Sequence, residues 1–334
     1  MDVTLAMLDN KYIDRKFKNQ KVIVTGGAGF IGSHIAEELL KLKAKVIIID
    51  DLSSGKIENI KYLSKIGNLE FIQGSIRDIV LLNNCFSGVD YIFHQAAIAS
   101  VPQSIDNPLV SHEVNITGTL NILLRAKENN VKKVVFASSC ALYGDTTELP
   151  LKENLLPNPL SPYAVTKMAG EYYCQIFKKV YGLNTVCLRY FNVYGPRQDP
   201  NSPYAAVIPL FIKMVLGGKS PTIFGDGGQT RDFVFVKDVV AANILATESD
   251  VSGIFNIGTG KAVNLNYLTD RIIKLCKQNI EIVHGQARVG DVRHSFGDVS
   301  KAEIFGFKPE YNLDNGLIET IVVMSRGLCE ITLD

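Results

Sequence analysis

Tyr163 and Lys167 are the residues of this 334-residue chain whose types and spacing best suit chemistry. They stand four positions apart, which puts both side chains on one face of a helix. A free tyrosine, with a pKa of about 10, is a poor base at neutral pH, but a neighbouring ammonium group stabilises the phenolate and lowers that pKa. Tyr163 can then exchange a proton with a substrate hydroxyl, and Lys167 can hold a nucleotide ribose. The same spacing also arises by chance, so other parts of the chain must support this interpretation.

A serine is expected beside this pair. The apolar run 133–139 predicts a strand that ends in Ser138 and Ser139. From there Ser139 can bridge Tyr163 and the reacting oxygen, although a hydroxyl at a strand end can also bond only to backbone. His94 invites a catalytic role too, but it stands inside the apolar run 89–97, which favours a hydrogen-bonded core histidine.

The stretch 21–50 predicts a nucleotide site. It contains an apolar strand, a glycine-rich turn, an amphipathic helix, a second apolar strand and an acid. Gly26 permits the tight turn, Gly29 lets a pyrophosphate approach the backbone, and Gly32 lets the helix pack closely on the strand. The helix N-terminus attracts phosphate. Asp50 can bind two ribose hydroxyls and would repel a 2′-phosphate, so NAD is favoured over NADP.

Strands and helices alternate along the first part of the chain. Apolar runs that begin near residues 22, 46, 69, 89, 133 and 185 predict six strands. This alternation predicts an α/β fold with a doubly wound parallel sheet covered on both faces. From about residue 198, prolines, glycines and short mixed elements replace it. We expect a nucleotide-binding domain at 1–197, including an extension at 1–19, and a smaller α/β substrate domain at 198–334, with some exchange of strands and helices.

Composition excludes several functional classes. The 35 basic and 34 acidic residues give a net charge of +1, which favours neither nucleic acid nor a membrane surface as a partner. No apolar run approaches the roughly 18 residues that span a bilayer. The six cysteines are scattered without a C-x-x-C pair, which is typical of buried thiols in a reducing cytoplasm. No metal site is expected.

Four motifs, at 25–32, 138–145, 161–167 and 188–192, resemble the extended short-chain dehydrogenase/reductases, and among them the nucleotide-sugar epimerase/dehydratase family. The resemblance covers nearly the whole chain, and the segments 189–209 and 225–238 look most like UDP-N-acetylglucosamine (UDP-GlcNAc) 4-epimerases. It implies a Rossmann domain whose NAD stays bound and is regenerated in each cycle. It also implies interconversion of UDP-GlcNAc and UDP-GalNAc through a transient 4-keto sugar, with UDP-glucose and UDP-galactose as a further pair.

The resemblance also assigns site residues. Tyr163, Lys167 and Ser139 are the expected catalytic residues. Contacts with NAD are expected at Gly26, Gly29, Phe30, Ile31, Gly32, Asp50, Asp51, Ser53, Gly55, Ser75, Ile76, Gln95, Ala96, Ala97, Asn115, Ser138, Tyr163, Lys167, Tyr190 and Val193. Contacts with the UDP-sugar are expected at Ser100, Ser139, Cys140, Tyr163, Asn192, Ala206, Val207, Thr222, Phe224, Arg231, Arg288, Asp291 and Ser295. Among these, the two arginines would clamp the diphosphate.

One feature separates the branches of the family. Dehydratases and decarboxylases resemble one another in having an acid just after the strand-end hydroxyl, where this chain has Cys140 and Ala141 and no carboxylate until Asp145. Elimination chemistry therefore lacks its acid, whereas epimerisation needs only the tyrosine, the lysine and the hydroxyl. A UDP-glucuronate 4-epimerase, a decarboxylase or a dehydratase are the alternatives. A non-enzymatic NAD-binding protein is disfavoured because binding needs no proton relay.

The chain also departs from its family in the cofactor contacts. Ser75 stands where many relatives have an aspartate for the adenine amino group, and Ala99 replaces a lysine of some UDP-galactose 4-epimerases.

Ser295 is the expected sugar gate. In the family, the matching position lies beside C2 of the sugar, where a tyrosine fills the space that an N-acetyl group needs. A serine leaves that space open. The alternative is an ordinary loop serine.

Chains of this family usually pair through two helices from each subunit. Here these would be the segments 108–129 and 162–181, which carry apolar residues beyond the needs of one face, namely Leu109, Val110, Ile122, Tyr172 and Phe177. We therefore expect a homodimer built on a four-helix bundle.

Overall fold

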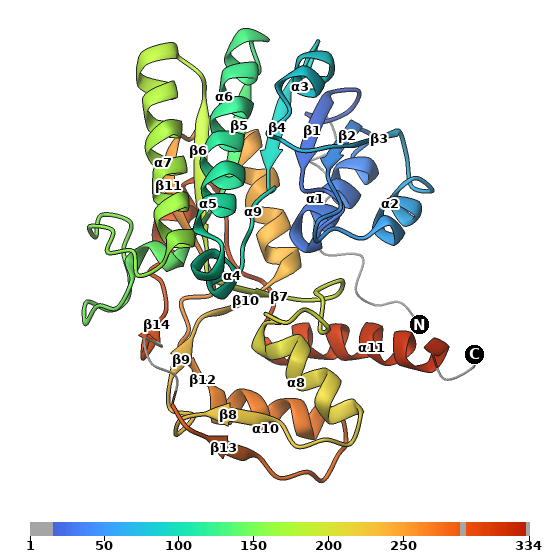
Figure 1. Ribbon diagram of the computed structural model, residues 1–334, viewed down its shortest axis with the longest axis vertical. Helices are drawn as coiled ribbons and strands as arrows, with labels where there is room; N and C mark the ends of the chain where they lie inside the picture. Colours follow the sequence, from blue (N-terminus) through green and yellow to red (C-terminus); the bar gives the residue numbers. More distant parts are fainter. Residues whose placement is uncertain (1–15, 288–291, 332–334) are drawn as a thin grey trace.

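A seven-stranded parallel sheet forms the core of the larger part of the molecule (Figure 1). The computed structural model describes residues 16–287 and 292–331. The strand order is β3-β2-β1-β4-β5-β6-β11, and all six neighbouring pairs are parallel. The strands are β1 (Lys21–Thr25), β2 (Lys45–Asp50), β3 (Leu69–Gln73), β4 (Tyr91–His94), β5 (Lys133–Ser139), β6 (Thr185–Tyr190) and β11 (Gly253–Ile257). The predicted doubly wound α/β fold is confirmed.

Helices cover both faces of this sheet, as the continuous apolar strands require. On one face, α1 (Phe30–Lys41), α2 (Ile57–Leu63) and α9 (Val236–Glu248) contribute to one hydrophobic cluster. On the other, α3 (Ile79–Cys85), α6 (Gly118–Glu128) and α7 (Pro162–Tyr181) contribute to a second. Ile122 and Phe177 belong to the second cluster. The expectation that they form a surface between subunits is therefore wrong, because their side chains face the sheet.

The end of the predicted N-terminal extension joins the core. Phe17 is fully buried, and its ring lies 5.7 Å from that of Tyr91 and 6.3 Å from that of Phe93. The neighbouring Lys16 side chain donates to the carbonyl groups of Thr247 and Glu248 at the end of α9. Residues 1–15 lie outside the described residues.

A smaller part packs below the sheet in the view of Figure 1. It holds three short sheets: β7 (Asn192–Tyr194) with β10 (Phe233–Phe235); β9 (Thr230–Arg231) between β12 (Val263–Asn264) and β14 (His294–Ser295); and β8 (Thr222–Phe224) with β13 (Val283–Gly285). The helices α8 (Val207–Leu216), α10 (Leu265–Leu275) and α11 (Leu313–Ile331) surround a third hydrophobic cluster. Between these elements the chain returns to the large sheet as α9 and β11. The boundary at residues 197 and 198 stays a prediction.

The carboxyl ends of β1, β4, β5 and β6 meet at one edge of the sheet. The strand order reverses between β1 and β4, which is the switch point where doubly wound sheets bind ligands. The short helices α4 (Val101–Asp106) and α5 (Pro108–His112), the π-helical turn η1 (Glu113–Thr117) and the 3₁₀ turn η2 (Cys140–Tyr143) surround this edge. Within the described ranges, no helix is long and apolar enough to cross a membrane.

Candidate active site

The predicted catalytic residues come together at the end of β5 and the start of α7. Ser161 caps α7, because its hydroxyl accepts a bond from the Ala164 amide at 3.2 Å. The hydroxyl of Ser104 accepts a second bond, from the Tyr163 amide at 3.0 Å. These bonds fix the first turn of α7, and from it the Tyr163 phenol lies beside Ser139, whose side chain lowers the pKa of the phenol.

Burial governs the protonation of this site. It raises the pKa of Tyr163 to about 12, and the side chain of Ser139 offsets only part of that shift. Burial also lowers the pKa of Lys167 to about 8. The Lys167 ammonium lies 5.8 Å from the centre of the Tyr163 ring and donates to the Ala137 carbonyl at 2.8 Å. In the protein without ligands the pKa of Tyr163 is therefore raised, opposite to the lowering expected from Lys167, because burial removes the hydration of the phenolate.

Asn115 holds α7 in place from the π-helical turn. Its side-chain oxygen accepts from the Ile98 amide at 2.8 Å, and its NH₂ group donates to the Ile98 carbonyl and to the Thr166 hydroxyl, both at 3.0 Å. Thr166 stands between Tyr163 and Lys167. The polar atoms of Asn115, predicted to contact NAD, therefore link the loop after β4 to α7.

The glycine turn after β1 forms a cradle that side chains would fill. Gly26 has a φ of +68°, and a Cβ there would lie 2.8 Å from the backbone of Ala96. A Cβ on Gly32 would lie 2.2 Å from the Gly26 carbonyl oxygen. Gly29 is the N-cap of α1 and makes no side-chain cap, so the first amides of the helix, at Phe30 and Ile31, can receive a phosphate.

Asp50 lies at the end of β2, only 8% exposed. Its two carboxylate oxygens accept from the amides of Ala28 at 3.0 Å and Leu52 at 2.9 Å. A Cβ on Gly55 would lie 2.7 Å from one of these oxygens, so the loop closes tightly around the acid. Asp51 and Ser53 are exposed in the same loop. The cradle and this carboxylate fit the pyrophosphate and ribose of NAD.

The two residues expected to contact the adenine, Ser75 and Ile76, form hydrogen bonds to other protein groups. The Ser75 hydroxyl accepts from the backbone amide of Arg77 at 3.3 Å and from its guanidinium at 3.4 Å. Ile76 is buried beside it, and its carbonyl accepts from Asn121 at 3.2 Å. The serine that replaces the family's aspartate therefore fixes its own loop.

Gln95 and Tyr190 meet through a residue that sequence reasoning missed. The Tyr190 hydroxyl accepts from the NH₂ of Asn243 at 2.8 Å and bonds with Gln95, whose NH₂ lies 3.2 Å away. Asn243 is fully buried in α9. The apolar residues around it in the sequence give no indication that it would contact Tyr190. Ala96, Ala97 and Val193 are partly buried at the same edge of the sheet.

Ser138 points away from the expected cofactor contact. Its hydroxyl donates to the Glu171 carboxylate at 2.6 Å, and the same carboxylate binds the Arg189 guanidinium at 2.8 and 2.7 Å. Sequence reasoning missed both charged residues. Glu171 follows Lys167 by four positions, and Arg189 is an isolated charge in the apolar strand β6, so their spacing and context were the available signals.

Some of the predicted substrate residues line one cavity, others lie outside it, and two lie outside the described residues. A cavity of about 280 Å³ is lined by Asn192, Val193, Ala206, Val207 and Arg231, together with Tyr194, Gln198, Ala205, Ile208, Phe233 and Leu265. Thr222 and Phe224 pair with β13 outside this lining. Ser100 caps α4 by accepting from the Gln103 amide. Arg288 and Asp291 lie outside the described residues.

Ser295 lies beside the predicted catalytic residues. Its hydroxyl lies close enough to the thiol of Cys140, which directly follows Ser139, to lower the pKa of that thiol. Burial raises the pKa of this thiol to about 12, so Cys140 stays protonated and uncharged. The structure therefore brings a residue of β14 to the end of β5, across 155 positions of sequence.

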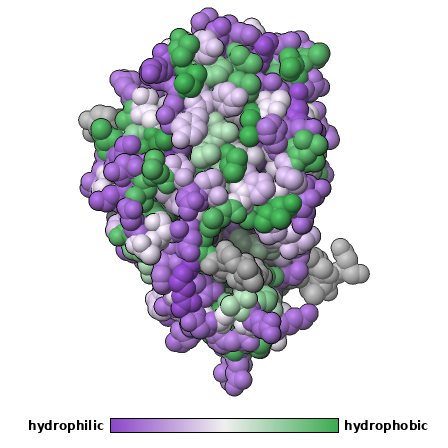
Figure 2. Space-filling model, turned by 60° about the vertical axis from the view of Figure 1, so that its left-hand side comes forward, coloured by the Kyte–Doolittle hydropathy of each residue, from purple (hydrophilic) through white to green (hydrophobic). Residues whose placement is uncertain are grey.

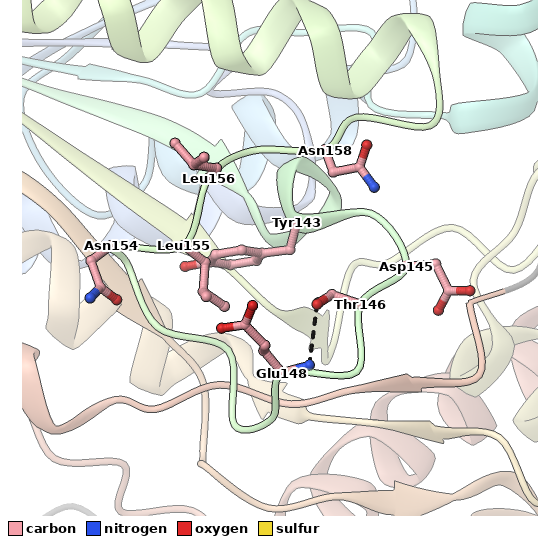
Figure 3. Close-up of a pocket in the computed structure, with 8 residues that line it drawn as sticks. All are labelled: Tyr143, Asp145, Thr146, Glu148, Asn154, Leu155, Leu156 and Asn158. Atoms are coloured by element: carbon pink, nitrogen blue, oxygen red, sulfur yellow. Dashed lines mark hydrogen bonds between the residues drawn. The ribbon is translucent and has the colours of Figure 1, made fainter.

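A larger cavity of about 450 Å³ lies in the loop after η2 (Figure 3). It is lined by Tyr143, Asp145, Thr146, Glu148, Asn154, Leu155, Leu156 and Asn158, and includes none of the predicted catalytic residues. The one hydrogen bond drawn within it runs from the Glu148 amide to the Thr146 hydroxyl, at 3.2 Å. In the described ranges, no group of three or more His, Cys, Asp or Glu residues could hold a metal.

His94 is a hydrogen-bonded core residue, as the sequence favours. Its Nδ1 lies 2.7 Å from the Thr25 hydroxyl and its Nε2 lies 2.8 Å from the Thr119 hydroxyl. Burial lowers its pKa to about 3. The ring therefore stays neutral at neutral pH.

Residues 22–258 match the model of the NAD-dependent epimerase/dehydratase family. The putative UDP-glucose 4-epimerase of Methanocaldococcus jannaschii is 43% identical over 308 residues, which cover 92% of this chain and 99% of that one. The structure of UDP-N-acetylglucosamine 4-epimerase from Methanobrevibacter ruminantium, solved with UDP-N-acetylmuramic acid, has a TM-score of 0.90 at 45% identity, covering 93% and 99%. UDP-glucose 4-epimerase from Thermus thermophilus, solved with NAD, has a TM-score of 0.84 at 36% identity, covering 92% and 99%.

The buried imidazole of His94 predicts a pH dependence of stability. The unfolded chain takes up a proton on this group at a pKa of about 6.5, whereas the folded protein does so only near about 3. The unfolded state therefore binds more protons between these values, and the free energy of unfolding falls as the pH decreases through this window. From pH 7 to pH 5 this group should remove about 2 kcal/mol.

Chemical denaturation at pH 7 and pH 5 gives the change in the free energy of unfolding for the wild type and for His94→Asn. The variant should lack the part of this change that is due to His94. Nitrogen NMR of the imidazole gives an independent reading. A ring that titrates above pH 6 in the folded protein would contradict the assignment.

Proposed function

Since the chain belongs to the NAD-dependent epimerase/dehydratase family, with NAD as its cofactor, we propose that it is a UDP-sugar 4-epimerase that interconverts UDP-GlcNAc and UDP-GalNAc. The observation that carries this proposal is the group of the buried Tyr163 and Lys167 with the partly buried Ser139, and with Ser295 beside Cys140. UDP-glucose and UDP-galactose are proposed as a second substrate pair.

The three catalytic residues can move one proton at one sugar oxygen. Bound NAD supplies the acceptor, and then the donor, of the hydrogen exchanged at C4. Because burial keeps Tyr163 a neutral phenol, it must first lose its own proton. As the phenolate it then takes the proton of the O4 hydroxyl and later returns it, with Ser139 between the phenol and the sugar oxygen. Lys167 provides a positive charge that favours the phenolate. Rotation of the 4-keto sugar between the two half-reactions presents its opposite face, which inverts C4.

The surroundings of Ser139 support epimerisation over elimination. Cys140 stays an uncharged thiol, and Asp145 is exposed in the outer loop. The buried Asp232 also acts on Cys140, but one of its oxygens accepts from the amide and hydroxyl of Thr259 and the other from the Gly260 and Gly297 amides. A carboxylate committed to these donors is poorly suited to a second proton transfer.

The sugar assignment rests on the size of the side chain at position 295. Ser295 is 9% exposed and packs beside Cys140, so the side chain at this position limits the space next to the catalytic serine. A serine leaves room for an N-acetyl group, whereas a phenol ring would occupy it. The similarity to a UDP-N-acetylglucosamine 4-epimerase supports this choice, and the similarity to UDP-glucose 4-epimerases supports the second pair.

A homodimer is proposed from the exposed apolar residues on α5 and α7. Leu109 is 69% exposed, Tyr172 54%, Ile176 49% and Val180 61%. Figure 2, which brings the α7 side of the molecule forward, shows hydrophobic residues spread among hydrophilic ones on this face. Several large exposed apolar side chains on two adjacent helices are typical of a subunit contact, and a four-helix bundle would cover them.

The first test is the phenol of Tyr163. Tyr163→Phe removes the proton carrier but keeps the ring, so turnover should fall by about 10²–10⁴-fold while NAD still copurifies. Steady-state assays with UDP-GlcNAc, together with release and quantification of the nucleotide, measure both effects. Tyr91→Phe, at the opposite end of β4, is the matched control. Near-normal turnover of Tyr163→Phe would exclude this residue from the mechanism.

Product analysis separates the proposal from its alternatives. Release of CO₂, or a stable 4-keto-6-deoxy product, would indicate a decarboxylase or a dehydratase. Turnover of UDP-glucuronate in preference to the other sugars would indicate a UDP-glucuronate 4-epimerase. Bound NAD without any turnover of UDP-sugars would indicate a binding protein.

The second test is Ser295→Tyr. Filling a packed site with a ring costs about 1–3 kcal/mol, which is a loss of about 5- to 150-fold in kcat/KM for UDP-GlcNAc. Activity on UDP-glucose should persist, because that sugar needs no space for an acetamido group. If the variant handles UDP-GlcNAc as well as the wild type does, Ser295 is not the gate.

The third test is the assembly. Sedimentation at micromolar concentration should give a dimer for the wild type and mostly monomer for Ile176→Asp, because a carboxylate would be buried without a partner in the bundle. Ile304→Asp changes a residue of similar type that is 74% exposed on η3 (Ser300–Phe305), and it should stay dimeric. A monomeric wild type would refute the proposal.

A further inference from the structure

The segment that carries Ser295 is tied to a distant loop. We call residues 295–298 the gate segment. The Leu151 amide donates to the Phe296 carbonyl at 2.9 Å, and the Asp298 amide donates to the Leu151 carbonyl at 2.8 Å. A Cβ on Gly297 would lie 2.6 Å from the Phe191 ring, so the segment also packs tightly against the residue that follows β6. The position of Ser295 therefore depends on what holds Leu151.

Asn256 on β11 holds both sides of this contact. Its NH₂ group donates to the Leu151 carbonyl at 2.9 Å and to the Asp298 carbonyl at 3.1 Å, and its backbone amide donates to Glu153 at 2.8 Å. Its side-chain oxygen accepts from the Tyr143 hydroxyl at 2.6 Å. Asn256 is fully buried, so no water substitutes for any of these partners. The bond from Tyr143 therefore fixes which way the amide of Asn256 points.

Tyr143 connects Asn256 to the catalytic helix. The guanidinium carbon of Arg189 lies 4.8 Å from the centre of the Tyr143 ring. Arg189 binds Glu171 through two hydrogen bonds, and Glu171 accepts a third from Ser138. Glu171 lies one turn beyond Lys167 on α7, and Ser138 directly precedes Ser139. A continuous set of buried polar contacts thus runs from the catalytic residues to the gate segment.

We propose that Tyr143 and Asn256 are positioning residues that set the gate segment relative to Ser139 and Tyr163, and so determine which C2 substituent the sugar site accepts. This inference rests on the proposed function, because it concerns the gate assigned to Ser295. Neither residue acts on the sugar directly. They act through the backbone of the gate segment, which the Asn256 NH₂ group holds on one side and Leu151 on the other.

Loss of the Tyr143 hydroxyl should affect acetylated sugars most. Tyr143→Phe leaves the Asn256 oxygen buried without its donor, which favours rotation of the amide away from Leu151 and Asp298. The gate segment then loses the bond from Asn256 to the Asp298 carbonyl, and Leu151, which holds the segment through its own backbone, loses the other. Reaction rates depend on placement to within about 1 Å, and an acetamido group next to the gate is more sensitive to its position than a hydroxyl.

The test compares Tyr143→Phe with Tyr91→Phe, a control that removes a phenol hydroxyl from a buried tyrosine at the amino end of β4. In Tyr143→Phe, the ratio of kcat/KM for UDP-GlcNAc to that for UDP-glucose should fall about tenfold, with bound NAD unchanged. Tyr91→Phe should keep the wild-type ratio. A wild-type ratio in Tyr143→Phe would overturn the inference.

The double variant Tyr143→Phe/Ser295→Tyr adds a coupling measurement. If Tyr143 acts through the gate segment, its effect on the ratio should disappear once the tyrosine at 295 has closed the site. An undiminished effect would show that Tyr143 acts by another route and would overturn the inference. Asn256→Asp, which replaces the NH₂ donor with an acceptor, should reproduce the change in ratio if Tyr143→Phe does not fold.

Hydrogen exchange of the amides at 296–298 gives a readout that does not depend on activity. Exchange should become about tenfold faster in Tyr143→Phe and stay unchanged in Tyr91→Phe. Unchanged exchange in Tyr143→Phe would overturn the inference. A wild type that is inactive on UDP-GlcNAc would instead refute the proposed function, and the exchange rates would still decide whether Tyr143 holds the gate segment.

Discussion

The buried ion pair between Glu171 and Arg189 is the interaction on which the arrangement of the site depends. Both side chains are almost fully buried, at 3% and 2% exposure, so other interactions must offset their loss of hydration. Two parallel hydrogen bonds between the two side chains, and a third from Ser138 to Glu171, supply this stabilisation. Removing one partner of such a pair typically costs about 3–5 kcal/mol, because the other charge stays buried. The pair joins α7, β5 and β6, which carry the predicted catalytic residues and the strand beside them.

Close backbone packing, by contrast, shapes the cofactor end. The contact between Gly26 and Ala96 brings the ends of β1 and β4 together at the switch point of the sheet. Gly32 brings α1 equally close to the turn. Because no side chain intervenes, the first amides of α1 stay available to an anion. Asp50 is the side chain expected to bind the ribose. Two backbone amides fix the orientation of its carboxylate.

Desolvation determines the charges of the site more than the pairing of charges does. Burial moves the pKa of Tyr163 up to about 12 and that of Lys167 down to about 8. In the absence of ligands Tyr163 is therefore a neutral phenol, and Ser139 beside it provides a path for its proton. Cys140 is kept uncharged by the same effect, which leaves the sugar side of Ser139 without an ionised group at that position.

The sequence by itself determined the features that are encoded over short distances. The glycine turn and Asp50 lie within 30 residues, and Tyr163 and Lys167 lie within one helical turn. Periodicity and spacing were therefore sufficient to predict six of the seven strands and the parallel sheet, and to propose the NAD site and the reactive pair. The tertiary structure alone decided the rest. It showed that β11 completes the sheet and that Asn243 joins Tyr190 and Gln95. It turned Ser138 toward Glu171, reversed the expected shift of the Tyr163 pKa, and brought Ser295 to Cys140 and Asn256 to Tyr143. These contacts join residues up to 155 positions apart, and desolvation depends on every atom packed around a group, so neither leaves a local pattern in the chain.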